Sequence, residues 1–186
     1  MTFRSGEILN LSNEFNTAIS YKEYIDLLGQ YLSLHQLHYN KFVVDENTAR
    51  IVFGFRSLKI LVITEPWCCD SLALLPIIRK LAEINGRWEI KVHLRDSNPD
   101  LMNKFLTNGA RAIPIFLFLD HQGDVLFKWG PRPKASIEIF EKHREMIKNG
   151  QIEKKEVIKK IRAFYAKDRG KTTLVELMML FKEKNL

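Results

Sequence analysis

Residues 67–71, Trp-Cys-Cys-Asp-Ser, place the chain's two cysteines side by side. An apolar segment with helical spacing begins at Cys68, so this thiol is expected in the first turn of a helix. The unpaired backbone N–H groups of a first turn, and the positive end of the helix dipole, stabilise a thiolate. Because the thiolate is the form of cysteine that attacks disulfides, this segment indicates thiol–disulfide exchange with Cys68 as the nucleophile.

The elements on either side of the cysteines place them between a strand and a helix. The β-branched and leucine run at 58–64 is typical of a strand buried on both faces of a sheet. From Cys68 to Asn85 the apolar residues recur with helical spacing, and Asn85-Gly86 is a C-terminal cap signal. The strand therefore leads straight into the helix at the cysteines.

Strands and helices alternate along most of the chain, and capping boxes are predicted at 20–23 and 173–176. Since parallel strands need crossover helices and the last two strands are joined by a tight turn, the order predicts an α/β fold whose mixed sheet is covered by helices on both faces. The predicted elements are strands at 49–55, 58–64 and 88–94, a hairpin over 113–129, and helices at 21–35, 68–85, 98–109, 135–148, 151–167 and 173–183.

Two segments in this order resemble the thioredoxin family. Residues 60–71 (ILVITEPWCCDS) are similar to its active-site segment, where a strand ends in Trp-Cys-x-x-Cys at a helix start. Residues 111–130 (RAIPIFLFLDHQGDVLFKWG) are similar to its later segment, where a cis proline, here Pro114, faces the reactive sulfur. Gly130 matches the family's glycine turn beside the substrate groove. Trp-Cys-x-Asp-Ser and the later WGPRP further resemble a bacterial thioredoxin-like subgroup.

The resemblance covers roughly residues 58–148 and implies a thioredoxin fold. One domain is expected over 1–186, with a core at about 50–149. Residues 1–45 and 151–186 would then be helical extensions at the two ends.

Ser71 departs from the family pattern, since it occupies the place of the second cysteine. In the family's dithiol mechanism a second thiol, one helical turn along, resolves the mixed disulfide, and serine lacks that chemistry. Cys69 is a poor substitute, because adjacent Cα atoms lie about 3.8 Å apart, below the usual disulfide range of about 4.4–6.8 Å. A single-thiol route is therefore expected, in which Cys68 attacks and a small external thiol releases the product.

The neighbours of Cys68 allow alternative interpretations. Asp70 either tunes the site or relays a proton, or it interacts with the first-turn N–H groups. Its charge opposes thiolate formation, so Cys68 is expected to be less acidic than its place at a helix start implies. Trp67 is expected to pack with one face on the groove. Cys69 is either a small buried apolar residue or a participant in the chemistry.

A groove is expected beside Pro114. A cis Ile113–Pro114 bond would leave an exposed edge at which peptide substrates pair with the backbone of Ile113, whereas the alternative is a trans proline entering a strand. Trp129 and Arg132 would flank the same groove. Arg132 either receives an anionic group or is a surface arginine braced by two prolines.

Composition and charge narrow the class of protein. The chain has a net charge of +7, and its basic surplus lies wholly within residues 128–171. This stretch forms either a surface for nucleic acid or an acidic partner, or solvated helix faces. No nucleic-acid motif accompanies it, so nucleic acid binding is not expected. No apolar run approaches the ~20 residues of a membrane span, and the start lacks the apolar centre of a secretion signal. A cytoplasmic protein without a membrane partner is expected, its two cysteines kept as thiols.

Metal and cofactor sites are not expected. His35 and His38 lie three apart on a predicted helix, but no acidic or cysteine ligand is placed to complete a metal site, so core or surface histidines are expected. The chain has no glycine-rich phosphate loop and no serine nucleophile elbow.

Three functional hypotheses follow. In the first, Cys68 exchanges disulfides with protein or small-molecule thiols. In the second, the protein is a binding module whose groove at Pro114 holds a peptide and whose thiol is incidental. In the third, the basic C-terminal helices dock onto nucleic acid or an acidic protein. A buried sulfur, or a thiol pKa near 8.5 or above, favours the second hypothesis over the first.

Overall fold

The computed structural model of this protein describes residues 9–186. Its elements in chain order are α1 (Ser12–Thr17), β1 (Ile19–Ser20), α2 (Tyr21–Asp26), a short 3-10 helix (Gly29–Tyr31), α3 (Leu32–Lys41), α4 (Glu46–Gly54), β2 (Leu58–Thr64), α5 (Cys69–Asn85), β3 (Trp88–Leu94), α6 (Pro99–Asn103), β4 (Ile115–Leu119), β5 (Val125–Trp129), α7 (Lys134–Glu141), α8 (Arg144–Lys148), α9 (Lys154–Asp168) and α10 (Lys171–Glu183).

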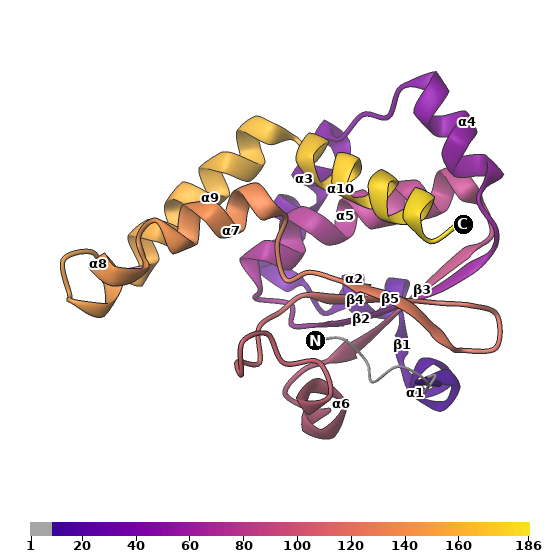
Figure 1. The fold of residues 1–186 in the computed structure, drawn as a ribbon, viewed down its shortest axis with the longest axis horizontal. Coiled ribbons are helices and arrows are strands. Elements are labelled where there is room, and N and C mark those ends of the chain that lie inside the picture. The colour runs from indigo at the N-terminus through magenta and orange to yellow at the C-terminus, as the bar shows by residue number, and fades with distance from the viewer. Residues whose placement is uncertain (1–8) are drawn as a thin grey trace.

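A mixed sheet of five strands lies at the centre of the molecule, in the order β1-β3-β2-β4-β5 (Figure 1). β2 and β3 run parallel and are joined by the crossover helix α5, whereas β4 and β5 form an antiparallel hairpin beside β2. The two-residue strand β1 pairs antiparallel with β3 at the other edge. This arrangement confirms the predicted α/β fold with a mixed sheet.

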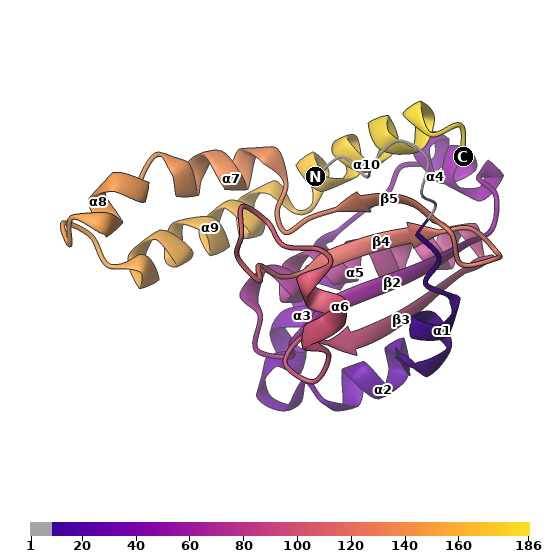
Figure 2. The same ribbon diagram turned by 60° about the horizontal axis from the view of Figure 1, so that its bottom comes forward.

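Helices cover both faces of the sheet. Alternate residues of β2 point to opposite sides, so each face presents apolar side chains that a helix layer buries. Ile60 and Val62 pack in one hydrophobic cluster with α5, whereas Leu61 and Ile63 pack in another with α1 and α6. Figures 1 and 2 show α3, α5 and α10 over the first face and α1 and α6 over the second. In both views α7 and α9 form a helical hairpin that projects beyond the sheet.

The C-terminal helix α10 completes the core on the α5 face. The buried ring of Phe181 has its centre 5.3 Å from those of Phe55 and Trp88, and 5.5 and 5.9 Å from those of Phe118 and Phe127. All four pairs are edge-to-face, a geometry that adds to the stabilisation from burial. α9 and α10 confirm the predicted C-terminal helices, and α10 belongs to the main hydrophobic core.

The strand predicted at 49–55 is wrong, because most of these residues belong to α4. Asp45 caps this helix by accepting hydrogen bonds from the backbone N–H and the hydroxyl of Thr48. Val52 is buried and Phe53 is exposed, as on a helix that packs by one face. The β-branched and aromatic residues suggested a strand, but the cap that starts the helix lies upstream of them.

Other elements differ in extent from the prediction. The helix expected at 21–35 is broken into α2 and α3, with Gly29 between them at a φ of +48°. The helix expected at 98–109 is limited to α6, and the one at 135–148 is divided into α7 and α8. The short strand β1 was not predicted, because two residues carry no periodic signal.

The capping box predicted at 173–176 is wrong, because α10 already begins at Lys171. Glu176 instead accepts hydrogen bonds from the indole N–H of Trp129 (3.2 Å) and the backbone N–H of Lys134 (2.6 Å). This carboxylate therefore ties α10 to the end of β5 and the start of α7.

The capping box at 20–23 is confirmed. The Ser20 hydroxyl accepts from the backbone N–H of Glu23 (3.2 Å), and the Glu23 carboxylate accepts from the backbone N–H of Ser20 (2.7 Å). We expect Ser20→Ala to lower the free energy of unfolding by about 1 kcal/mol in urea titrations, since it leaves a helix N–H without its partner. Ser33→Ala, at an exposed position of α3, is the control. An equal loss in both variants would contradict a capping effect.

Candidate functional site

Cys68 is the N-cap residue of α5, at the turn that follows β2. Its backbone N–H donates to the carbonyl of Glu65 (3.1 Å), and its carbonyl accepts from Leu72 (3.0 Å). The thiol donates to the carbonyl oxygen of Ile113, with Sγ at 3.5 Å. The Ile113–Pro114 peptide bond is cis, so of the two forms considered from the sequence the structure has the cis one. The cysteine and the proline loop therefore face each other.

The thiol of Cys68 is less acidic than a free cysteine. The residue is only 6% exposed, and this burial, which disfavours the charged form, is the main reason that its pKa is raised. The negative charge of Asp70 raises the pKa further. The backbone N–H groups of Ser71 and Asp70 and the Ser71 hydroxyl act in the opposite direction, but they are outweighed. The activated thiolate that the helix start indicated is therefore not present, because burial of the sulfur outweighs the stabilisation by the first-turn N–H groups.

Ser71 lies beneath the site and is fully buried. Its hydroxyl is hydrogen-bonded to that of Thr64, the last residue of β2. The residue that stands where the dithiol pattern has a cysteine therefore joins α5 to the sheet.

Asp70 is held by two partners from distant parts of the chain. The Arg132 guanidinium lies 2.7 Å from Asp70 Oδ2 in an ion pair, and the Tyr165 hydroxyl donates to Oδ1 at 2.8 Å. Both ionic side chains are largely buried, with 19% and 8% of Arg132 and Asp70 exposed. Arg132 is thus neither an open anion receptor nor a free surface arginine, because its charge is already paired. Tyr165 also accepts from the Ser136 hydroxyl at 3.3 Å.

Tyr165 is a site residue that the sequence did not reveal. It lies on α9, and it is 5% exposed, so in the sequence it was indistinguishable from the apolar face of a helix. Burial and the nearby Asp70 carboxylate hold its pKa well above the ordinary value for tyrosine. Tyr165 is therefore neutral and serves Asp70 as a hydrogen-bond donor.

A groove of about 520 Å³ opens beside Cys68. Trp67 is half-exposed at its rim, where the guanidinium of Arg95 lies 5.0 Å from the ring centre. Cys69 is partly exposed there as a free thiol. The full lining is Trp67, Cys68, Cys69, Asp70, Arg95, Ala110, Arg111, Ala112, Ile113, Pro131, Arg132, Phe140, Lys154 and Ile158.

The rim of this groove is basic, which the sequence did not indicate because the residues come from separate loops and helices. Arg95 follows β3, Arg111 precedes the proline loop and Lys154 begins α9. The one carboxylate in the lining is that of Asp70, which Arg132 neutralises. Arg95 is paired with Asp96 at 2.8 Å, so the net positive charge of the groove comes from Arg111 and Lys154, which form no ion pair among residues 9–186.

Trp129 does not flank the groove as expected. Its side chain is 6% exposed and packs against Phe116, with ring centres 5.4 Å apart. Gly130 lies beneath the proline loop at a φ of +109°. A Cβ atom at Gly130 would overlap the carbonyl oxygen of Pro114, so glycine is needed to bring the two loops together. The Gly130–Pro131 bond is also cis.

Residues 9–186 contain neither a membrane-spanning helix nor a cluster of metal ligands. No helix there is both long and apolar enough to cross a membrane. Within the same residues, no three His, Cys, Asp or Glu side chains are grouped so as to hold a metal ion. His35 is a core residue, hydrogen-bonded to the Tyr21 hydroxyl at 2.7 Å, and burial lowers its pKa to about 4.

A family model described as thioredoxin matches residues 18–149, which reaches further towards the N-terminus than the segments that carried the resemblance. No curated protein matches the chain. A protein of unknown function, PA1234 from Pseudomonas aeruginosa, superposes with a TM-score of 0.64 at 16% identity, over 91% of this chain and 98% of its own. An HIV epitope-scaffold superposes with a TM-score of 0.62 at 18% identity, over 70% and 82%. These two likenesses concern the fold alone.

Proposed function

This chain belongs to the thioredoxin family, and we propose that it is a peptide-binding member whose groove beside Cys68 and Pro114 receives an extended segment of a partner protein. The observation that carries the proposal is the burial of the Cys68 sulfur, with a raised thiol pKa, next to an open basic groove. Exchange of disulfides is slow when little thiolate is present, whereas binding does not require it.

The backbone of Ile113 supports peptide binding at this place. Its N–H makes no hydrogen bond among residues 9–186, and its carbonyl is occupied only by the thiol of Cys68. An extended peptide pairs with such groups through its main chain, while its side chains select for pockets on either side. The aromatic and aliphatic surfaces of Trp67 and Ile158, together with the basic rim, favour a segment that alternates apolar and acidic residues.

Single-thiol exchange is a second candidate, favoured by the position of the sulfur against the same carbonyl (3.5 Å). A substrate paired at Ile113 would bring its disulfide next to Cys68. The thiol would lose its proton and attack one substrate sulfur; a mixed disulfide would form, and the other sulfur would leave as a thiolate and take up a proton. A small external thiol would then attack the Cys68 sulfur, break the mixed disulfide and release the reduced substrate. A second such thiol would attack the new mixed disulfide, return Cys68 to the free thiol and leave as the small-molecule disulfide. Both candidates suit a reducing compartment such as the cytoplasm, since both cysteines are free.

One experiment separates the two candidates. The rate of Cys68 alkylation by iodoacetamide is measured against pH in a Cys69→Ser background, with Cys68→Ser as the blank. We expect a midpoint above the ordinary range of a free cysteine, about 8.5, because burial and Asp70 both disfavour the thiolate. A midpoint below that range would overturn the binding proposal in favour of exchange.

Binding is measured in parallel with a short fluorescein-labelled peptide of alternating valine and glutamate, by anisotropy. Cys68→Ser should bind as the parent does, since the sulfur contributes no required bond. Arg111→Glu should weaken binding several-fold by reversing a charge on the rim, whereas Lys142→Glu, at an exposed position away from the groove, should not. Equal effects of the two reversals would contradict binding at this groove.

A further inference from the structure

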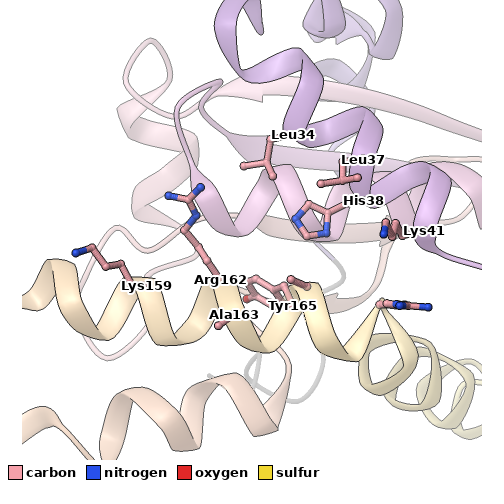
Figure 3. A pocket seen from close by; sticks show the side chains of 10 residues that line it. Leu34, Leu37, His38, Lys41, Lys159, Arg162, Ala163 and Tyr165 are labelled. Atoms are coloured by element: carbon pink, nitrogen blue, oxygen red, sulfur yellow. The ribbon is translucent and has the colours of Figure 1, made fainter.

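A second groove lies between α3 and α9, away from Cys68, with a volume of about 430 Å³ (Figure 3). One face of each helix lines it, since the contributing positions on both helices recur at spacings of three and four. Figure 3 shows the α3 side chains pointing towards α9. The lining is Leu34, Leu37, His38, Lys41, Lys159, Arg162, Ala163, Tyr165, Ala166 and Arg169.

The charge of this groove is of one sign. Four of its lining residues are lysine or arginine, and none is acidic. Lys159 is paired with Glu156 at 2.8 Å, but Lys41, Arg162 and Arg169 form no ion pair among residues 9–186. The cations come from both helices, so positive charge borders the groove on both sides.

The floor between these cations is aliphatic. Leu34 and Leu37 line it from α3, and Ala163 and Ala166 line it from α9. Leu37 is 49% exposed although it is a large apolar side chain. The short side chains of these two alanines leave room for an apolar side chain on the α9 side of the groove. An apolar strip bordered by cations on both sides complements an element with an apolar stripe bordered by acids.

We propose that this groove docks an amphipathic helix of a partner protein, with leucine-type side chains on its inner face and glutamate or aspartate on its flanks. The groove is formed by two helix faces, and a third helix packs into such a groove by its own side-chain ridges. Charge complementarity selects the acidic flanks and excludes basic competitors.

Nucleic acid fits the same groove less well. Single strands bind by stacking bases on exposed aromatic rings above a cationic track. The one phenol ring in the lining, Tyr165, is buried and has its hydroxyl committed to Asp70. The remaining ring, the imidazole of His38, is partly buried, and the rest of the lining is aliphatic or cationic. A base would therefore find little stacking surface, and the protein helix is the favoured occupant.

The test uses the full chain and three probes with the same fluorescent label. The first is a designed peptide helix with leucine on one face and glutamate on both flanks, the second is the same composition scrambled, and the third is a single-stranded RNA. The variant Lys41→Glu with Arg162→Glu reverses one charge on each side of the groove. The matched control, Lys160→Glu with Lys167→Glu, makes the same change in net charge at exposed positions of α9 outside the lining.

The designed helix should bind the parent and the control, and bind the groove variant at least about tenfold more weakly. Added salt should weaken its binding, because exposed charges are screened. Circular dichroism confirms that each variant is folded. Equal binding of the scrambled peptide, an equal loss in the control variant, or no binding at millimolar peptide would overturn the proposal. RNA binding that depends on the groove in the absence of peptide binding would overturn it in favour of a nucleic acid site.

Discussion

Asp70→Asn should make Cys68 react about threefold faster with iodoacetamide at neutral pH. After burial, the Asp70 charge is the largest cause of the raised thiol pKa, and the substitution removes it while Arg132 keeps its positive charge. Removing a like charge from beside a titrating group raises the ionised fraction by roughly tenfold. The thiolate formed is less nucleophilic, which offsets about a factor of three. The midpoint of the alkylation profile should therefore move to lower pH.

The effect requires a negative charge close to Cys68. Removing a carboxylate elsewhere should therefore leave the reactivity of Cys68 unchanged. Asp26→Asn removes an exposed carboxylate that forms no ion pair among residues 9–186. Asparagine at position 70 still offers a carbonyl oxygen to the Tyr165 hydroxyl. If Asp70→Asn left the profile of Cys68 unchanged, burial alone would control the thiol, and the charge of Asp70 would have no influence on it.

Gly130→Ala should lower the free energy of unfolding by about 4 kcal/mol. The backbone there has a φ of +109°, which costs a residue with a side chain about 1–3 kcal/mol. The new methyl group would also overlap the carbonyl of Pro114, and relief of such an overlap costs a further ~1–3 kcal/mol. Denaturant titration followed by circular dichroism measures the sum.

Gly109→Ala separates the two causes of this loss. Gly109 has a φ of +77°, but nothing lies within 4 Å of the position its Cβ would take. Its substitution should therefore cost only the backbone strain, about 1 kcal/mol. The excess loss at Gly130 measures how tightly its loop packs under the proline loop. Equal losses of unfolding free energy at the two glycines would show that the Gly130 loop is not tightly packed against the proline loop.

Local signals were enough to predict the part of the fold that holds Cys68. The nearly unbroken apolar run of β2, the helical spacing after it and the glycine cap at Gly86, with its φ of +74°, are all contained in one stretch of chain. That Pro114 faces the sulfur was implied by the resemblance to the thioredoxin family, and its place at the start of a strand added the argument for a cis bond. Where the local signals conflicted, as in α4, the cap at Asp45 decided the outcome over β-branched content.

The burial of the Cys68 sulfur and the pairing of Asp70 were not predictable in this way, although the sequence did predict that the Asp70 charge opposes thiolate formation. Both depend on groups brought together only by the tertiary fold: Arg132 is 62 residues from Asp70, and Tyr165 is 95. A helix start predicts a stabilised thiolate only where water or amides reach the sulfur. Here the carbonyl of Ile113 lies over it, so burial outweighs the helix.

The position of Phe181 bears on how the protein is synthesised. Its ring closes a cluster with Phe55, Trp88, Phe118 and Phe127, all of which are translated well before it. A nascent chain at the ribosome therefore carries these four aromatic side chains without their cover until α10 has left the exit tunnel. Exposed aromatic surface of this kind is what holding chaperones bind and what drives aggregation. Final closure of this core therefore waits until α10 is free to pack against the sheet.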